Sequence, residues 1–486
     1  MLSILVAHSY FLRFDQKQLE RAKPYPPLAT LQVASSLREA GHQVAVFDAM
    51  LAGGVDEYDQ QLRASQPQLA LFYEDNFNFL SKMCLGKMRQ AACDMIGNAH
   101  RSGARVIVAG SDASDAPASY LAAGAEVVLI GEGLSALRAL LRRLNSDPTL
   151  STTQWVADIS GIVTITNGRL NVPKSKPNSL DQQQSSRPAW DLIDIERYRS
   201  TWRSVHGFFS LNMAASRGCS FRCHWCAKPI WGNHYLQRDP AEVAAEMSYL
   251  KRDFGPDHIW FADDIFGFRV DWVSKFAAAL HADHGSVPFT IQTRADLVST
   301  AMAGVLSEAG CREVWIGAES GSQRVLNAMN KGTTVEDISL ARKRLAATNI
   351  RVGFFIQLGY LGEELEDILA TRALIENTRP DDIGVSVSYP LPGTKFYELV
   401  RRQLQHKTHW QESKDLDMMF EGTYSSEFYR SIRDLLHDQV LLDNSNNQPH
   451  DADYQHARRS LQRRWDCLIA DEQEYRNYRA EVRAPC

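Results

Sequence analysis

The strongest constraint on the fold is a regular alternation of short apolar runs and amphipathic runs over the first 150 residues. Five apolar runs have the length of a strand, at 3–7, 43–47, 69–73, 105–109 and 126–130. Runs with helical spacing occur near 28–40, 58–64, 80–100 and 134–144. Strands that alternate with helices predict a parallel, doubly wound α/β sheet. We therefore expect a flavodoxin-like, Rossmann-like domain over residues 1–150.

The loops after the last two of these strands are rich in glycine. Gly110 and Ser111 follow the fourth strand, and Gly131 and Gly133 follow the fifth. Ligands of parallel sheets bind outside the carboxyl ends of the strands, and glycine allows the backbone to approach a bulky ligand. We therefore expect these four residues to contact a ligand of the first domain.

A connecting segment follows at residues 151–187. Its first part has the pattern of a small hairpin that turns at Asn167-Gly168. Its second part, from residue 173 onward, is rich in Pro, Ser, Asn and Gln and poor in apolar residues. That composition predicts a linker.

Residues 188–400 repeat the alternation of strands and helices. The expected strands lie at 209–214, 258–262, 289–292, 313–316, 351–357 and 382–387. This series predicts a partial parallel (β/α)6 barrel, in which functional side chains occupy the carboxyl ends of the strands. Residues 401–486 contain helical spacing and no further strand pattern, so we expect a small helical C-terminal region.

Three cysteines follow the first strand of this barrel. Cys219, Cys223 and Cys226 form a C-x3-C-x2-C pattern in one short loop. Three thiolates can hold three irons of a cubane cluster, whereas an electron-transfer cluster usually has four cysteine ligands. One iron would then stay open to a ligand, as a catalytic zinc keeps an open position. A zinc site that includes His224 or His234, or a purely structural loop, fits the same spacing.

Polar and small residues follow the later strands of the barrel. They are Asp263 and Asp264, Arg294, Glu319 and Ser320, and Gly359, and we expect all of them to contact a cofactor. A buried carboxylate at such a position needs a partner, and a cationic amine would serve. Each of these signals also fits an ordinary turn or helix cap.

The cysteine loop resembles the signature of the radical S-adenosylmethionine (SAM) superfamily, C-x3-C-x-(aromatic)-C, with Trp225 as the aromatic residue. The resemblance implies a 4Fe-4S cluster whose open iron chelates SAM and whose electron releases a 5′-deoxyadenosyl radical. It also implies that Trp225 contacts adenine and that Glu319 and Ser320 hold the ribose or the methionyl end. Gly359 would lie beneath the adenine.

The first domain resembles the cobalamin-binding domain that precedes many radical SAM domains. The resemblance rests on Pro26-Pro27-Leu28, Phe47-Asp48-Ala49 and the glycine loops at Gly110 and Gly131. An Asp-x-His-x-x-Gly element is absent, and His8 follows the first strand instead. We expect cobalamin without a protein histidine on cobalt. A scaffold that binds no cobalamin remains the alternative.

These features predict a cobalamin-dependent radical SAM enzyme that methylates an unactivated carbon of a small-molecule or lipid substrate. One alternative is a cyclase or rearrangement enzyme of the kind found in tetrapyrrole biosynthesis. Another, from a different class, is a non-catalytic iron–sulfur sensor. An enzyme of this kind needs an external one-electron reductant such as a flavodoxin or ferredoxin.

Composition bounds the partners and the compartment. The net charge of −5 argues against a general nucleic-acid binder. No run of about 18 apolar residues is present, so we expect no transmembrane helix. The N-terminal apolar run is short and lacks basic residues, which is typical of a buried strand and not of a signal peptide. Scattered cysteines outside the loop are typical of reduced thiols, so we expect a cytoplasmic protein.

Overall fold

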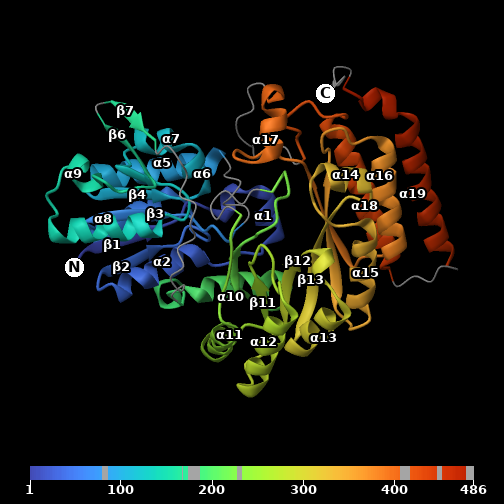
Figure 1. The fold of residues 1–486 in the computed structure, drawn as a ribbon, viewed down its shortest axis with the longest axis horizontal. Helices are drawn as coiled ribbons and strands as arrows, with labels where there is room; N and C mark the ends of the chain where they lie inside the picture. Colours follow the sequence, from blue (N-terminus) through green and yellow to red (C-terminus); the bar gives the residue numbers. More distant parts are fainter. Residues whose placement is uncertain are drawn as a thin grey trace. The chain divides into compact units, whose positions relative to one another are not determined.

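The computed structural model describes residues 1–78, 86–166, 168–172, 187–226, 233–404, 416–445 and 451–477 (Figure 1). Internal contacts divide these residues into two compact units. The first unit contains residues 1–220 and 233–263, and the second contains residues 221–226 and the described residues from 264 onward.

The first unit contains the predicted doubly wound sheet. Its strand order is β2-β1-β3-β4-β5-β6-β7, and β1 to β5 are parallel. The parallel strands are β1 Ser3–Ala7, β2 Gln43–Phe47, β3 Leu69–Tyr73, β4 Arg105–Ala109 and β5 Val127–Leu129. The order 2-1-3-4-5 is that of the flavodoxin-like fold, which confirms the predicted fold class.

The four longer helices of this sheet agree with the predicted helical runs. They are α2 Leu28–Glu39, α3 Val55–Ser65, α5 Gly86–Arg101 and α8 Leu134–Ser146. The start of the predicted helix at 80–100 lies outside the described residues. Four shorter helices were not predicted, because one or two turns show no period: α1 Gln16–Arg21, α6 Ser111–Asp115, α7 Pro117–Ala122 and α9 Thr152–Val156.

The predicted hairpin is present and joins the first sheet. Strands β6 Ile162–Thr166 and β7 Arg169–Asn171 pair antiparallel, and β6 also pairs antiparallel with β5. Gly168 has a φ of +72°, a conformation that glycine adopts readily. The hairpin therefore belongs to the edge of the sheet, whereas the linker residues 173–186 lie outside the described part of the chain.

The rest of the first unit begins the predicted barrel. Helix α10 Ile195–His206 precedes β8 Ser210–Met213, and β8 pairs in parallel with β11 His258–Phe261. Helix α11 Pro240–Phe254 lies between them in the sequence and is capped by Asp239. A two-stranded antiparallel ribbon, β9 Ser216–Gly218 with β10 Tyr235–Gln237, flanks the cysteine loop in the sequence.

The second unit contains four parallel strands that pair in chain order. They are β12 Phe289–Thr293, β13 Cys311–Glu319, β14 Arg351–Leu358 and β15 Asp382–Val387. Between and after them come α12 Val270–Ala282, α13 Thr300–Ala309, α14 Gln323–Ala328, α15 Val335–Ala346, α16 Leu365–Thr378 and α17 Lys395–Val400. This succession of parallel strands and helices is the predicted partial barrel.

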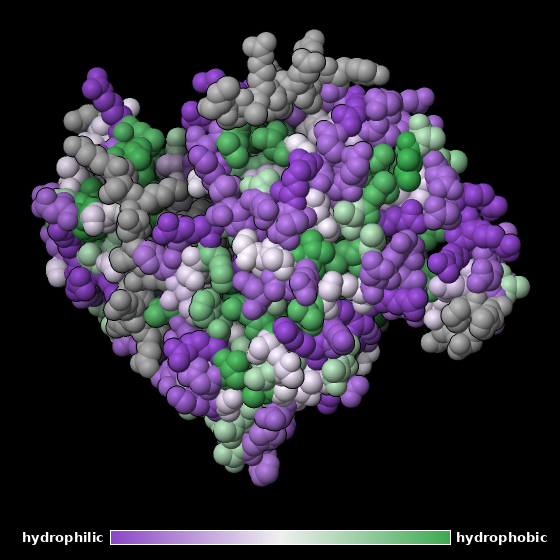
Figure 2. Space-filling model, turned by 45° about the vertical axis from the view of Figure 1, so that its right-hand side comes forward, coloured by the Kyte–Doolittle hydropathy of each residue, from purple (hydrophilic) through white to green (hydrophobic). Residues whose placement is uncertain are grey.

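The C-terminal region is helical, as predicted. Helix α18 Ser426–Asp443 packs against α16, β15 and α19 Ala452–Ala470. Tyr424, just before α18, is fully buried. No helix among the described residues has the length and apolar character needed to cross a membrane. Hydrophilic side chains predominate on the face drawn in Figure 2, and hydrophobic ones form smaller separate areas.

Candidate active site

The cysteine loop leaves strand β9 at Gly218, and backbone bonds of the second unit anchor its later part. Cys219 is buried, and Cys223 and Cys226 are half-buried. The His224 N–H donates to the carbonyl of Met329 (2.8 Å), and the His224 carbonyl accepts from the N–H of Phe396 (2.9 Å). These bonds hold the backbone of the loop without using any of the three thiols.

Arg294 contacts the second cysteine of the loop. Its side chain lies at the end of β12 and is almost fully buried. Its Nη1 lies 3.7 Å from Cys223 Sγ, and its guanidinium carbon lies 3.7 Å from the centre of the Phe221 ring. Asp296 accepts from Nε and Nη2 at 2.9 and 3.0 Å. The guanidinium is therefore held with one N–H group directed at sulfur.

Glu319 forms a buried ion pair at the end of β13. Its Oε1 lies 2.6 Å from Lys331 Nζ, and both side chains are about 5% exposed. A Cβ on Gly317 would lie 2.7 Å from both of these atoms, so a larger residue there would displace the ion pair. Glu319 has a φ of +62°, and the strand register shifts between Gly317 and Glu319. The backbone is distorted where the carboxylate leaves the strand.

Lys331 is a site residue that the sequence reasoning missed. Its Nζ lies 5.9 Å from the centre of the Trp225 ring. Burial lowers its pKa, but attraction to Glu319 and to Cys223 outweighs burial and raises the pKa overall. Lys331 follows α14, which separates it in the sequence from the strand end that carries Glu319, so no spacing signal connects the two residues.

Asp263 and Ser320, like Arg294 and Glu319, have partners within the protein. Asp263 is fully buried and accepts from the Ala215 N–H (3.0 Å) and the Ser216 hydroxyl (2.5 Å), which ties β9 to the end of β11. Asp264 follows it and is half-buried. Ser320 Oγ is fully buried and accepts from the Ser322 N–H (3.1 Å). Cofactor contacts by Asp263, Asp264 and Ser320 stay predictions.

Gly359 ends β14 with a φ of +71°. Its N–H donates to Glu363 Oε2 at 2.6 Å, and a Cβ here would lie 3.0 Å from Met418 Sδ. Glu363 has no solvent exposure, and burial raises its pKa to about 8. The glycine therefore packs against Met418, and its predicted place beneath adenine stays a prediction.

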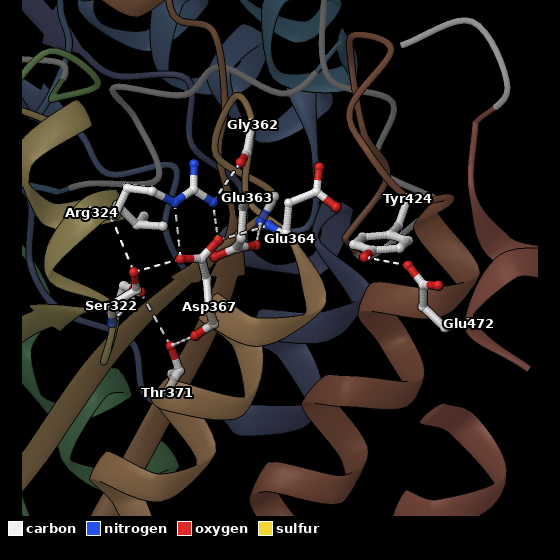
Figure 3. Close-up of polar contacts among 12 residues, drawn as sticks. Ser322, Arg324, Gly362, Glu363, Glu364, Asp367, Thr371, Tyr424 and Glu472 are labelled. Carbon is white, nitrogen blue, oxygen red and sulfur yellow. Dashed lines mark hydrogen bonds and ion pairs between the residues drawn. The ribbon is translucent and has the colours of Figure 1, made fainter. Parts of the chain in front are cut away.

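A polar network fixes the loop that contains Glu363 (Figure 3). Arg324 pairs with Asp367 and donates to the Gly362 carbonyl at 2.8 Å. Ser322 Oγ donates to Asp367 Oδ1 at 2.6 Å. The start of α14 is thereby tied to the start of α16, across the ends of β13 and β14.

Five polar atoms near these strand ends are buried without a hydrogen-bond partner among the described residues. They are Trp225 Nε1, Thr333 Oγ1, Gln357 Oε1, Glu363 Oε1 and Ser388 Oγ. Buried polar atoms in proteins are nearly always paired. Unpaired donors and acceptors beside a cysteine loop fit a polar ligand such as SAM, and the donor set of three thiols fits an iron–sulfur cluster.

The side-chain geometry gives no support to the alternative of a zinc site at the cysteine loop. Among the described residues, no three His, Cys, Asp or Glu side chains are grouped to hold one metal ion. His224 directs Nδ1 at the carbonyl of Ala328 (3.2 Å). In a cubane each cysteine binds a different iron, so cluster ligands need not converge on one point.

The glycine loops of the first sheet are more crowded than the sequence suggested. A Cβ on Gly110 would lie 2.8 Å from Glu74 Cγ, and one on Gly133 would lie 2.6 Å from Leu129 Cβ. Glu74, which follows β3, occupies the space above Gly110, and ligand contact by the glycine loops stays a prediction. Ser111 is buried at the start of α6. Gly131 has a φ of +71° and donates to Ser114 Oγ at 3.1 Å.

The His8 side chain makes hydrogen-bond contacts within the first unit. It is fully buried, and its Nε2 lies 3.0 Å from Asp48 Oδ1 and 3.0 Å from the Ala49 nitrogen. Asp48 also accepts from the Tyr198 hydroxyl at 2.6 Å. A ring nitrogen held in this way has little freedom to bind a metal, and the absence of a protein histidine on cobalt stays a prediction.

A second buried ion pair connects the first sheet to the cysteine strand. Arg217 in β9 pairs with Glu132, which lies between Gly131 and Gly133, and both side chains are less than a tenth exposed. The Glu132 carbonyl also accepts from the Tyr73 hydroxyl (2.8 Å). Neither residue was predicted, since a pairing across 85 positions leaves no local pattern.

The fold and these contacts define an α/β protein with a doubly wound domain and a partial barrel that carries a three-cysteine loop. Residues 213–375 match the sequence model of the radical SAM superfamily, and this region is a radical SAM domain.

Curated relatives align over more of the chain. An uncharacterized methyltransferase of Pyrococcus horikoshii is 24% identical over 60% of this chain and 62% of its own length. The anaerobic magnesium-protoporphyrin IX monomethyl ester cyclase of Synechocystis sp. is 24% identical over 79% of this chain and 75% of its own length. The chain thus spans somewhat less than two thirds of the Pyrococcus relative.

Solved structures share the fold. The cobalamin-dependent SAM radical enzyme OxsB, with aqua-cobalamin bound, has a TM-score of 0.71 at 16% identity and covers 96% of this chain and 72% of its own. The radical SAM methyltransferase TsrM from Kitasatospora setae has a TM-score of 0.67 at 20% identity and covers 98% and 91%. These similarities establish the fold alone.

Proposed function

We propose that this protein is a cobalamin-dependent radical SAM enzyme that methylates an unactivated carbon of a small-molecule or lipid substrate. The observation that carries the proposal is the loop of Cys219, Cys223 and Cys226, with a buried arginine donating to Cys223 Sγ. The radical SAM match over residues 213–375 and the flavodoxin-like strand order of the first sheet support it.

The described side chains have definite tasks in this proposal. When bound, the cluster and SAM supply a 5′-deoxyadenosyl radical, and cobalamin carries the methyl group. Glu319 and Lys331 present opposite charges that complement the ammonium and carboxylate groups of a methionyl moiety. Trp225 offers a ring face to adenine, and Gln357 and Ser388 offer unpaired hydrogen-bonding atoms.

The cluster is tested by anaerobic reconstitution with iron and sulfide. We expect one 4Fe-4S cluster per chain and formation of 5′-deoxyadenosine from SAM under reduction. Changing the three loop cysteines to Ala should remove both the iron–sulfur absorbance and the product. Cys467→Ala, at an exposed cysteine, is the matched control and should retain both. Stoichiometric zinc without iron uptake would contradict the proposal.

A ring-forming or rearrangement reaction is the second candidate. It is favoured by the similarity to the Synechocystis cyclase, which covers more of this chain than the Pyrococcus methyltransferase does. Mass spectrometry of a pathway intermediate distinguishes the two reactions, because methylation adds a carbon that originates from labelled SAM. A product without the label would favour the second candidate.

The remaining partners follow from the same proposal. The reaction needs an external one-electron reductant, such as a flavodoxin or ferredoxin. The net charge of −5 does not favour a nucleic-acid substrate. We place the enzyme in the cytoplasm, where reductants keep thiols reduced.

A further inference from the structure

We propose that Arg294 and Asp296 set the reduction potential of the cluster from opposite directions, Arg294 raising it and Asp296 lowering it. The inference rests on the proposed function and assigns Arg294 to the cysteine thiolate instead of to SAM. Both act as positioning residues, because they act on the cluster through Cys223.

The geometry aims one N–H group of Arg294 at the thiolate. Asp296 occupies Nε and Nη2, and Nη1 is left for Cys223 Sγ at 3.7 Å. The Phe221 ring lies against the guanidinium, 3.7 Å from its central carbon. Asp296 holds one edge of the guanidinium and Phe221 contacts its face, so Arg294 has little freedom to move away from the sulfur.

Burial makes this contact strong. The Arg294 side chain is 5% exposed and the Asp296 side chain is 26% exposed. A charge interacts more strongly where water is excluded, and hydrogen bonds to cluster sulfurs shift the potential of the cluster. Little water therefore screens the positive charge of Arg294 from the Cys223 thiolate. The carboxylate of Asp296, on the opposite edge of the guanidinium, offsets part of that charge.

The sign of each effect follows from charge. The cluster gains one electron from the external reductant, and no bond to Arg294 forms or breaks. The added negative charge is stabilised by a nearby cation and destabilised by a nearby carboxylate. Removing the cation should lower the potential, whereas removing the carboxylate should raise it. A merely structural role would move both variants in the same direction or not at all.

The test is a redox titration of reconstituted protein, followed by the paramagnetic resonance signal of the reduced cluster. Arg294→Gln should reduce the ratio of reduced to oxidised cluster at a fixed potential about tenfold, which is about 59 mV for one electron. Asp296→Asn should increase that ratio by roughly threefold, since Asp296 is farther from sulfur and more exposed. Arg294→Lys keeps the charge but loses the planar fork, so its ratio should lie between those of Arg294→Gln and wild type.

Arg351→Gln is the matched control. It also removes one positive charge from the second unit, but Arg351 is 60% exposed at the start of β14, and it should leave the potential unchanged. Shifts of equal sign in Arg294→Gln and Asp296→Asn, or no shift in either, would overturn the inference. If Arg294→Gln fails to take up the cluster, Asp296→Asn alone decides, and an unchanged or lowered potential would overturn it.

The inference and the proposed function fail in different ways. Wild-type protein that binds no cluster or leaves SAM intact contradicts the proposed function. Wild-type protein that cleaves SAM, with variants that do not shift in opposite directions, contradicts only the role of Arg294 and Asp296.

Discussion

The carboxyl ends of the two sets of parallel strands differ in how their polar groups are satisfied. In the first unit, His8 contacts Asp48, Arg89 binds Asp112 through two bonds, and Arg217 binds Glu132. In the second unit, five buried polar atoms near the strand ends have no partner among the described residues. The first edge also keeps one buried hydroxyl unpaired, that of Tyr58 beside Phe47 and Phe72, so the difference is one of degree.

This difference indicates two kinds of recognition. Unpaired buried groups cost stability, so a site keeps them where a ligand completes the hydrogen bonds. The second unit is therefore suited to a small polar molecule such as SAM. The paired groups of the first edge need no ligand to complete their hydrogen bonds.

The largest effect is expected at the buried pair of the second unit. Glu319→Ala leaves Lys331 charged and unpaired, and breaking a buried pair costs about 3–5 kcal/mol of stability. We also expect the affinity for SAM to fall about ten- to a hundredfold, which corresponds to roughly 1.5–3 kcal/mol. Denaturant unfolding and equilibrium binding measure the two effects, and the cluster should stay intact.

A double variant separates stability from binding. Glu319→Gln with Lys331→Met removes both charges and should recover most of the lost stability, because neither charge is left buried alone. SAM affinity should stay low. If the double variant recovered both stability and SAM affinity, the pair would have only a structural role. The same would follow if Glu319→Ala left the dissociation constant for SAM unchanged.

The pair of the first unit provides the contrasting case. Glu132→Gln should cost about 3 kcal/mol of stability, since Arg217 loses its buried partner. SAM affinity should change less than twofold, because Glu132 belongs to the loop after β5. Unfolding curves and SAM binding to reconstituted protein measure this, and a tenfold loss of affinity would argue against the contrast.

Glu363 makes stability depend on pH. Its folded pKa of about 8 lies above the ordinary value of 4.5, so the folded state binds more protons between these values and stability is lost as pH rises toward and through 8. Glu363→Gln has no charge to bury, so its stability should not fall in this way. The free energy of unfolding of the variant minus that of wild type should therefore increase by roughly 2–4 kcal/mol between pH 5 and pH 9. Unfolding at the two pH values checks this; a constant difference between the proteins would refute it.

The smallest effect on stability is expected at an unpaired atom. Ser388→Ala removes a fully buried hydroxyl that has no partner, so stability should be unchanged or rise by up to about 1 kcal/mol. SAM affinity should fall about fivefold if the hydroxyl binds the ligand. Ser322→Ala, whose hydroxyl has protein partners, is the control and should lose stability instead.

The sequence predicted elements better than contacts. Strands β1 to β4 agree with the predicted runs because each contains at least four consecutive apolar residues. Lys331 was not predicted because helix α14 separates it from Glu319 in the sequence, although the two side chains pair in the fold. The crowding at Gly110 was not foreseen, because the space above a glycine depends on a neighbouring segment, here through Glu74. Pairings between distant positions leave no local pattern in the sequence. The partners of the predicted site residues could therefore be identified only from the structure.

The central claim is that one chain uses both a radical SAM site and cobalamin. It is tested most directly by incubating anaerobically reconstituted protein with cobalamin, SAM and a reductant, and separating the protein by gel filtration. We predict that cobalamin is retained, that 5′-deoxyadenosine and S-adenosylhomocysteine both form, and that the reduced cobalt shows no nitrogen splitting in paramagnetic resonance. Formation of 5′-deoxyadenosine without retained cobalamin would contradict the claim and leave the first domain as a scaffold.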